Sequence, residues 1–367
     1  MEAVKLGLGL DLYRAAHLEV PVEQVKFVER LGYHSVWTAE AYGSDALTPL
    51  AYLAAHTNRI KLATGVVQLA ARTPAATAMA ALTIDAMAGG GRVIVGLGVS
   101  GPQIVEGWYG QPWGSPVNRL RDYVAIMRKV IAREGPVSHD GNEISLPYVG
   151  PGAIGQPKAL KSILHPAGKI EIWIAAGAPL NTALAAEVCD GWLPMGYGSD
   201  GWEVHGPNLE RGWARRGGRP EDFDIMGGLT IEITDDVKAA IAAKKPLTGM
   251  YVGGMGSESK NFHKEAMARR GFPEAAQRIQ DLWLAGRKDE AIAAVPDEYI
   301  DAGSLFGSAR RCRDRWNEVV PAGVTGLIVR SNSSDGLEVA ADMTGSRETT
   351  GTTTADVADA AEREEIR

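Results

Sequence analysis

Strand-like and helix-like segments alternate along most of this chain, and that alternation limits the folds available to it. Residues 4–10 alternate apolar and small side chains with a period of two, and residues 22–31 then place apolar side chains at helical spacing. Residues 34–38 and 47–55 repeat the pair. Strands that alternate with helices pair in parallel through crossovers, and repetition over about 330 residues predicts a closed (β/α)8 TIM barrel of the α/β class.

Further strand candidates continue the alternation. The third strand, at 60–67, is followed by an alanine-rich helix that we expect to begin at Pro74, with Thr73 as its N-cap. The remaining strands are predicted at 93–97, 170–175, 191–195, 223–233 and 324–329.

Two long insertions interrupt the pattern. They cover about 115–169, after the fourth strand, and about 247–304, late in the barrel. Both exceed ordinary βα loops and are therefore candidates for lids or subunit contacts. We expect one domain at 1–335 and a disordered tail at 344–367, because the tail has too few large apolar residues to pack.

Composition excludes several classes of function. A formal net charge of −7 argues against nucleic acid as a partner, because such binding draws on surplus Lys and Arg. No apolar run approaches the roughly 20 residues that cross a bilayer, so we expect no membrane segment. Cys189 and Cys312 stand far apart, outside any CxxC pattern. We therefore expect no metal site, no disulfide and a cytoplasmic location. With nucleic acid and membrane excluded, the expected partner is a small-molecule substrate.

Two turns of small residues follow predicted strands and lead into helices. The first contains Gly98, Val99, Ser100 and Gly101, and the second contains Ala176, Gly177 and Ala178. Backbone N–H groups in such turns can close on an anion, and the positive end of the helix dipole favours a phosphate there. Each turn alone is also compatible with a tight connection that binds nothing. Together they predict a single phosphate held from both sides.

The end of the third strand carries a third candidate, Thr64-Gly65-Val66. Glycine weakens a strand interior, and it often marks a bulge or the close approach of a flat ligand. Simple packing inside the barrel is the alternative.

Three polar residues near the strand ends are candidates for proton transfer or capping. Glu40 follows the second strand and could act as a general acid or base, or stand as an ordinary loop carboxylate. Asp45 is better interpreted as the cap of the next helix. His17, which follows the first strand, is the second catalytic candidate.

Several longer segments together resemble the luciferase-like monooxygenase family, in particular its branch that uses the deazaflavin coenzyme F-420. They are GVSGPQIVEGWYG at 98–110, ARTP at 71–74, IAAG at 174–177, CDGW at 189–192 and LWLAGRKDEA at 282–291. The similarity extends over roughly residues 4–330.

The resemblance implies a homodimeric barrel with the cofactor across its strand ends and the ribityl phosphate near Ser100, Gly101 and Gly177. It also implies a bulge with a non-proline cis peptide at Gly65-Val66. Relatives can carry an Asp-His pair after the second strand, where this chain has Ala39-Glu40. The family's acid/base pair is therefore not carried over.

The leading hypothesis is hydride transfer between coenzyme F-420 and a small alcohol, carbonyl or activated C=C compound. Glu40 would then be the proton partner, with His17 in reserve. Two alternatives remain open, an FMN-dependent monooxygenase that uses molecular oxygen and a flavin-binding protein without catalytic activity.

Overall fold

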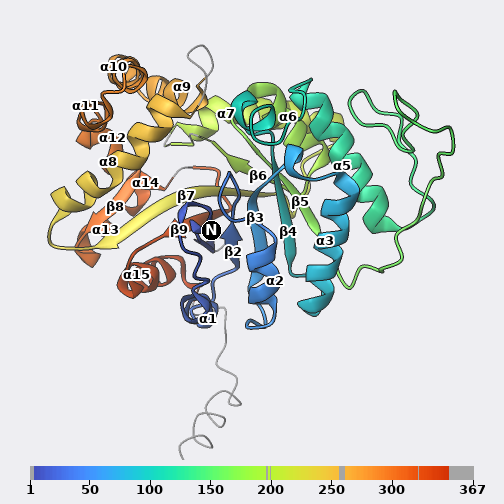
Figure 1. The fold of residues 1–367 in the computed structure, drawn as a ribbon. Helices are drawn as coiled ribbons and strands as arrows, with labels where there is room; N and C mark the ends of the chain where they lie inside the picture. The colour runs from blue at the N-terminus through green and yellow to red at the C-terminus, as the bar shows by residue number, and fades with distance from the viewer. Residues whose placement is uncertain (1–3, 196, 199, 256–260, 321, 347–367) are drawn as a thin grey trace, which may run out of the picture.

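The computed structural model describes residues 4–195, 197–198, 200–255, 261–320 and 322–346. Within them, eight parallel strands close a barrel and one further strand extends its sheet (Figure 1). The barrel strands are β1 (Lys5–Gly9), β2 (Ser35–Thr38), β3 (Lys61–Gln68), β4 (Val93–Gly98), β5 (Glu171–Ala176), β6 (Gly191–Pro194), β7 (Asp224–Ile233) and β9 (Gly326–Arg330). Pairing of β6 with β7, β7 with β9 and β9 with β1 completes the ring. The predicted (β/α)8 barrel is confirmed.

Helices surround the barrel and connect its strands. They are α1 (Val22–Arg30), α2 (Thr48–Ala54), α3 (Pro74–Met87), α5 (Pro116–Ala132), α6 (Pro179–Val188), α7 (Gly201–Arg216) and α15 (Ser334–Thr344). The Thr73 hydroxyl accepts a hydrogen bond from the Ala76 N–H at 3.3 Å, so the predicted N-cap of α3 is present. Of the tail expected at 344–367, everything from 347 onward lies outside the described residues.

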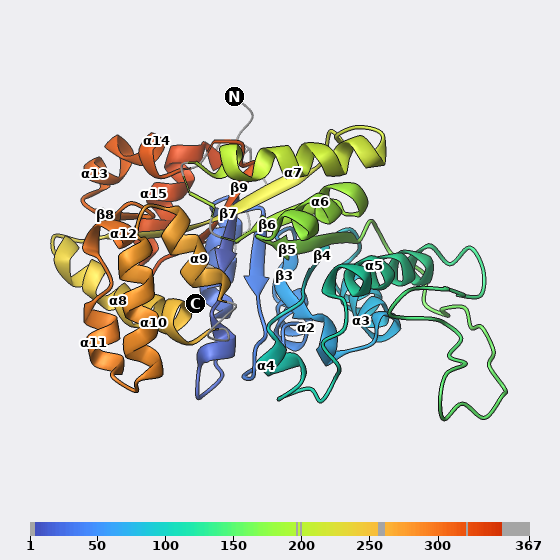
Figure 2. The same cartoon turned by 90° about the horizontal axis from the view of Figure 1, so that it is seen from above.

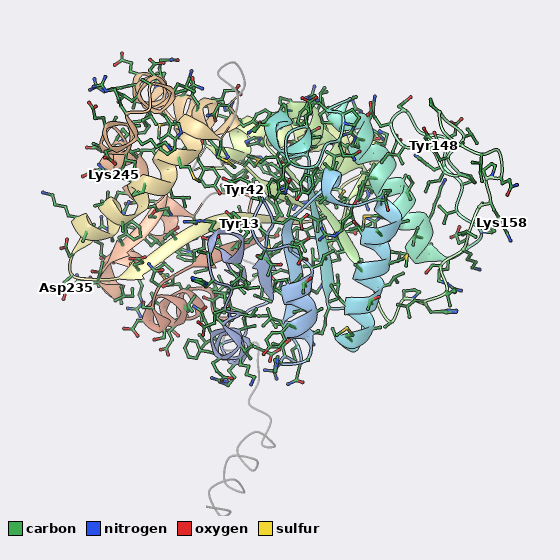
Figure 3. The ribbon with its side chains drawn as sticks, in the orientation of Figure 1. Tyr13, Tyr42, Tyr148, Lys158, Asp235 and Lys245 are labelled. Carbon is green, nitrogen blue, oxygen red and sulfur yellow. The ribbon has the colours of Figure 1, made fainter. Side chains whose placement is uncertain are left out.

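The two predicted insertions differ in structure. The first begins with α5, a regular helix of the ring, and continues as a long irregular segment that projects from one side of the molecule. Figure 3 labels Tyr148 and Lys158 on that projection. Within the ranges that the structure describes, no helix is both long and apolar enough to cross a membrane.

The second insertion is a layer of helices at one side of the barrel (Figure 2). It contains α8 (Val237–Gly254), α9 (Phe262–Arg269), α10 (Pro273–Leu284), α11 (Lys288–Ala293) and α12 (Asp297–Asp301). β8 (Ser304–Gly307) follows and pairs with the last residues of β7, before α13 (Ala309–Asp314) and α14 (Trp316–Val319) lead to β9. This layer lies on the opposite side of the barrel from α3 and α5.

The barrel interior is filled by side chains rather than open. The indoles of Trp37 and Trp173 lie at its centre with ring centroids 5.4 Å apart, and both are buried. Charged residues begin the odd-numbered strands β1, β3, β5 and β7, and they form ion pairs between Lys5 and Asp224 and between Lys61 and Glu171. The N-terminal end is therefore closed, and binding space lies at the opposite end.

Glu29 of α1 holds the start of β3. One oxygen of its buried carboxylate accepts hydrogen bonds from the N–H groups of Asn58, Arg59 and Ile60, at 2.9, 2.7 and 2.9 Å. Burial raises the pKa of the Glu29 carboxyl, but the three backbone hydrogen bonds lower it further, and the net pKa is below the ordinary value.

We predict that Glu29→Gln lowers the free energy of unfolding at pH 7 by about 1–2 kcal/mol, because the amide keeps an acceptor but loses the charge. A carboxyl with a depressed pKa stabilises the fold above its unfolded-state pKa, near 4.3, and loses that effect as the pH falls. The difference from wild type should therefore shrink between pH 6 and pH 3, as measured by urea unfolding. Glu23→Gln, on the exposed face of the same helix, is the matched control. A difference independent of pH would contradict the assignment.

Candidate functional site

A cavity of about 310 Å³ lies at the C-terminal ends of β4 and β5, between these strands and α9. Both predicted turns line it, as does the end of β3. The lining comprises Val66, Gly98, Val99, Ser100, Gly101, Pro102, Gln103, Ile104, Trp113, Ala175, Ala176, Gly177, Ala178, Pro179, Asn181, Met195, Met255, Phe262, His263, Glu265 and Arg269. The structure thus brings the two turns together on one space.

The turn after β4 has two glycine positions where a side chain would not fit. A Cβ atom on Gly98 would lie 2.5 Å from Val66 Cγ2, and one on Gly101 would lie 2.6 Å from Gln103 Oε1. Ser100 between them has a φ of 59°, in the left-handed region that non-glycine residues rarely adopt. The short helix α4 (Pro102–Val105) follows, and Gly98 and Gly101 place no side chain at the cavity wall.

The turn after β5 presents a helix N-terminus. Pro179 is the first residue of α6, and its N-cap Ala178 has no side-chain hydrogen bond to the first turn. The N–H groups at the start of a helix that lacks a side-chain cap are available to an anion. Asn181 Oδ1 is buried beside them and has no hydrogen-bond partner in the described part of the chain. An orphaned amide and an uncapped helix start both fit a polar ligand group.

The end of β3 forms the third side. The peptide bond between Gly65 and Val66 is cis, and the register between β3 and β4 shifts between Gly65 and Val67. Val66 lines the cavity, whereas Thr64 and Gly65 do not. The Thr64 hydroxyl instead donates to Gly96 O at 3.0 Å and accepts from Gly96 N at 2.9 Å, so it joins β3 to β4.

Glu40 does not face the cavity. Its carboxylate accepts from the N–H groups of Gln68 at 2.8 Å and Ala46 at 3.1 Å, and it receives Arg72 Nη1 at 3.0 and 2.9 Å. A carboxylate has about four lone-pair sites, and these contacts use all of them. Glu40 is also absent from the lining of the cavity, and these contacts favour a structural role for it.

The contacts of Glu40 hold the bulge of β3. Its backbone N–H donates to Val66 O at 3.3 Å, while its carboxylate binds the N–H of Gln68 two residues further on. Glu40 therefore fixes the backbone on both sides of Val67, next to the residue that lines the cavity. The neighbouring Asp45 accepts from the N–H groups of Leu47 and Thr48, both at 2.8 Å. The N-cap position of α2 is Leu47, so Asp45 supports the turn before the helix and is not its N-cap residue.

His17 is exposed in the segment that follows β1, and it is absent from the cavity lining. A catalytic histidine must come within hydrogen-bond reach of the reacting group, or within one water of it. The cavity lining does not include His17, and its catalytic role stays a prediction from the sequence.

Sequence reasoning missed the contribution of α9. Phe262, His263, Glu265 and Arg269 from this helix form the outer wall of the cavity. Burial lowers the pKa of His263 to about 4, so its imidazole is neutral at pH 7. The available signal was Asn261, which caps α9 by accepting from the N–H groups of His263 and Lys264, both at 3.0 Å. An asparagine cap predicts where a helix starts, but it does not predict which cavity the helix will cover.

Two further cavities continue this space toward the ends of β7 and β9. One of about 290 Å³ shares Met195, Phe262 and His263 with the first cavity. The next, of about 440 Å³, shares Tyr251 and Lys244 with the second. The three cavities therefore lie next to one another at this end of the barrel, and Lys244 and Arg270 line the middle one.

Comparison with known proteins agrees with this architecture. The family model described as luciferase-like monooxygenase matches residues 7–326. A Mycobacterium tuberculosis protein whose name assigns it to the coenzyme F-420-dependent oxidoreductases is 46% identical over 339 residues, which cover 91% of this chain and 97% of the relative.

Solved structures share the fold at lower identity. The coenzyme F-420-dependent tetrahydromethanopterin reductase of Methanopyrus kandleri has a TM-score of 0.73 and 22% identity, covering 94% of this chain and 98% of that one. The oxygenating constituent of 3,6-diketocamphane monooxygenase from Pseudomonas putida, solved with FMN, has a TM-score of 0.64 and 17% identity, covering 94% and 98%. The predicted resemblance is confirmed: the chain is an oxidoreductase that belongs to the luciferase-like monooxygenase family.

Proposed function

We propose that this enzyme binds coenzyme F-420 in the cavity between α9 and the turns after β4 and β5, and uses it for hydride transfer with a small organic substrate. The observation that carries the proposal is that both turns line one cavity, beside an orphaned amide oxygen. The relative that is 46% identical supports the choice of cofactor.

The residues present fit an anionic cofactor with a flat ring. The N–H groups near Ser100 and at the start of α6 would hold its phosphate, and Arg269 at the outer wall would face negative charge. Val66 and Met195 offer apolar surface further along the same lining. Bound there, the deazaflavin supplies a carbon centre that accepts or donates a hydride.

The chain's own part in such a reaction is to bind, orient and exclude water. Tyr13 and Tyr251 face the cavity of about 440 Å³, with their hydroxyl oxygens 2.9 Å apart. Burial, followed by the influence of Tyr251, raises the pKa of Tyr13 well above its usual range, so its hydroxyl stays protonated. We propose that this hydroxyl pair donates a hydrogen bond to the oxygen of a carbonyl or alcohol. Figure 3 labels Tyr13 near the centre of the molecule.

The main alternative keeps the cavity and changes the cofactor. FMN also carries a phosphate, and the structural neighbour solved with FMN has the same fold. Equilibrium titration of the protein with coenzyme F-420 and with FMN separates the two proposals. We expect F-420 to bind more tightly than FMN. If FMN alone binds, the proposal of hydride transfer is wrong and a monooxygenase that uses molecular oxygen is favoured instead. If bound, reduced F-420 were never reoxidised by a broad panel of carbonyls and enones, the non-catalytic binding hypothesis would gain support.

We predict that Gly177→Asp weakens the affinity for F-420 about tenfold more than Gly177→Asn does. Both side chains meet Met195, because a Cβ on Gly177 would lie 3.1 Å from Met195 Cβ, so the pair differs mainly in charge. Fluorescence titration of F-420 measures the two affinities. Equal losses in the two variants would place the phosphate away from this turn.

We predict that Arg72→Met lowers the free energy of unfolding by about 3 kcal/mol, because it leaves the buried Glu40 carboxylate without its counter-charge. Glu40→Gln should lower it by less, because Arg72 keeps Asp45 as a partner at 3.4 Å. The double variant should lose clearly less than the sum. Affinity for F-420 should fall in Glu40→Gln, because the β3 backbone beside Val66 loses its support.

Urea unfolding and F-420 titration test this pair, with the exposed Glu19→Gln as the control. Additive losses would show that Glu40 and Arg72 act independently. Unchanged F-420 affinity in Glu40→Gln would show that the contacts of Glu40 with the β3 backbone do not affect cofactor binding.

A further inference from the structure

Two cations face the middle cavity of about 290 Å³ without a carboxylate to neutralise them. Lys244 of α8 and Arg270, the residue after α9, both line it, and its lining contains no Asp or Glu. Among the residues that the structure describes, neither takes part in an ion pair within 4.0 Å. Other cations of the barrel do, as Lys5 pairs with Asp224 and Arg330 pairs with Asp11.

Both cations are positioned by uncharged groups. Lys244 Nζ donates to the hydroxyl of Thr230 on β7 and to that of Ser304 on β8, the latter at 3.4 Å. The guanidinium of Arg270 lies over the ring of Tyr299, 4.5 Å from its centroid. A Cβ atom on Gly303 would lie 3.5 Å from Arg270 Nη2, so both cations approach the short segment 303–304.

We propose that Lys244 and Arg270 form the site that binds an oxyanion of the substrate, a carboxylate or a phosphate ester. The proposal rests on the proposed function, because this cavity shares Met195, Phe262 and His263 with the cavity assigned to the cofactor. A substrate anchored here by its oxyanion would have its remaining part directed along walls that also contact the cofactor.

The rest of the lining fits the body of such a molecule. Leu247, Val252, Phe262, Tyr299 and Ile300 supply apolar and aromatic surface around the two charges. A mostly apolar pocket with a few convergent polar groups is the usual form of a small-molecule site. The two positive charges also repel each other, and an anion bound between them would relieve that repulsion.

The charge on Lys244 depends on groups from four elements. Burial lowers its pKa to about 8, with a further lowering from Arg330 on β9 and from Arg270, while Glu232 on β7 and Asp11 after β1 oppose it. Both of these acids are already engaged, Glu232 with Asn332 and Asp11 with Arg330. An oxyanion at the site would raise the pKa of Lys244, because it stabilises the protonated form.

The affinity for an oxyanion should therefore depend on pH in a defined direction. Below pH 8 the ammonium is present in the free protein and binding is at its strongest. Above pH 8 the free protein loses that proton, and the affinity should fall by up to about tenfold per pH unit until the pKa of the complex is reached. In Lys244→Arg the charge persists to about pH 12, so the fall between pH 7.5 and pH 9.5 should disappear.

Three probes with one phenyl body test the site: benzoate, phenyl phosphate and the uncharged benzamide. Isothermal titration calorimetry measures their binding to the purified protein, with and without F-420. We expect benzoate or phenyl phosphate to bind at least about tenfold more tightly than benzamide, and the tighter of the two identifies the class of oxyanion. Lys244→Met and Arg270→Met should each remove most of that preference.

Lys245→Met is the matched control. It removes one positive charge from the next residue of α8, but Lys245 pairs with Asp297 at 2.5 Å and is absent from the lining of the three cavities. Figure 3 labels it on the side of the molecule away from Tyr148. Binding of the anionic probes should change less than twofold in this variant.

The proposal is overturned if benzamide binds as tightly as both anions, or if Lys244→Met and Lys245→Met have the same effect. A variant that does not fold is identified by its unfolding curve, and Lys244→Arg then decides through the pH dependence alone. Since the probes are titrated without cofactor as well, failure to bind F-420 would count against the proposed function and leave the oxyanion result standing.

Discussion

The two indoles at the barrel centre are the constraint on which the mouth of this enzyme depends. Trp37 and Trp173 occupy space that glycines on the surrounding strands leave free. A Cβ atom on Gly7 would lie 2.5 Å from Trp37 Nε1, and one on Gly191 would lie 2.5 Å from Trp173 Cε2. Gly65 lies above the six-membered ring of Trp37, with 3.2 Å between its Cβ position and Cε3. The tryptophans thus form the floor over which the β3 bulge lies.

Above this floor, small residues form the strand-end wall of the cavity of about 310 Å³. The turns after β4 and β5 contribute peptide groups, and the Glu40–Arg72 pair fixes the neighbouring bulge from behind. Backbone donors on strand ends are positioned more accurately than long side chains, because the sheet determines where they lie. The outer wall of that cavity and the lining of the middle cavity are different, because α8 and α9 supply side chains such as Lys244 and His263.

The regular elements could be predicted from the sequence because their signals are local. The β3 strand, the Thr73 cap and the two small-residue turns each lie within a few consecutive residues. The role of Glu40 could not be predicted, since its partner Arg72 is 32 residues away and the pairing depends on how β2 and β3 meet. The contribution of α9 was also hidden, because helical periodicity does not say which cavity a helix covers. The homodimer and the cytoplasmic location stay predictions.

The helical layer after β7 has a hydrophobic core of its own. Its buried residues, which include Ile241, Met267, Ile279 and Phe306, form a cluster separate from the main core of the barrel. β8 attaches this layer to the final residues of β7, beyond the point where β7 pairs with β6. A change of packing inside this separate core would therefore shift α9, and with it the outer wall of the cavity at the ends of β4 and β5.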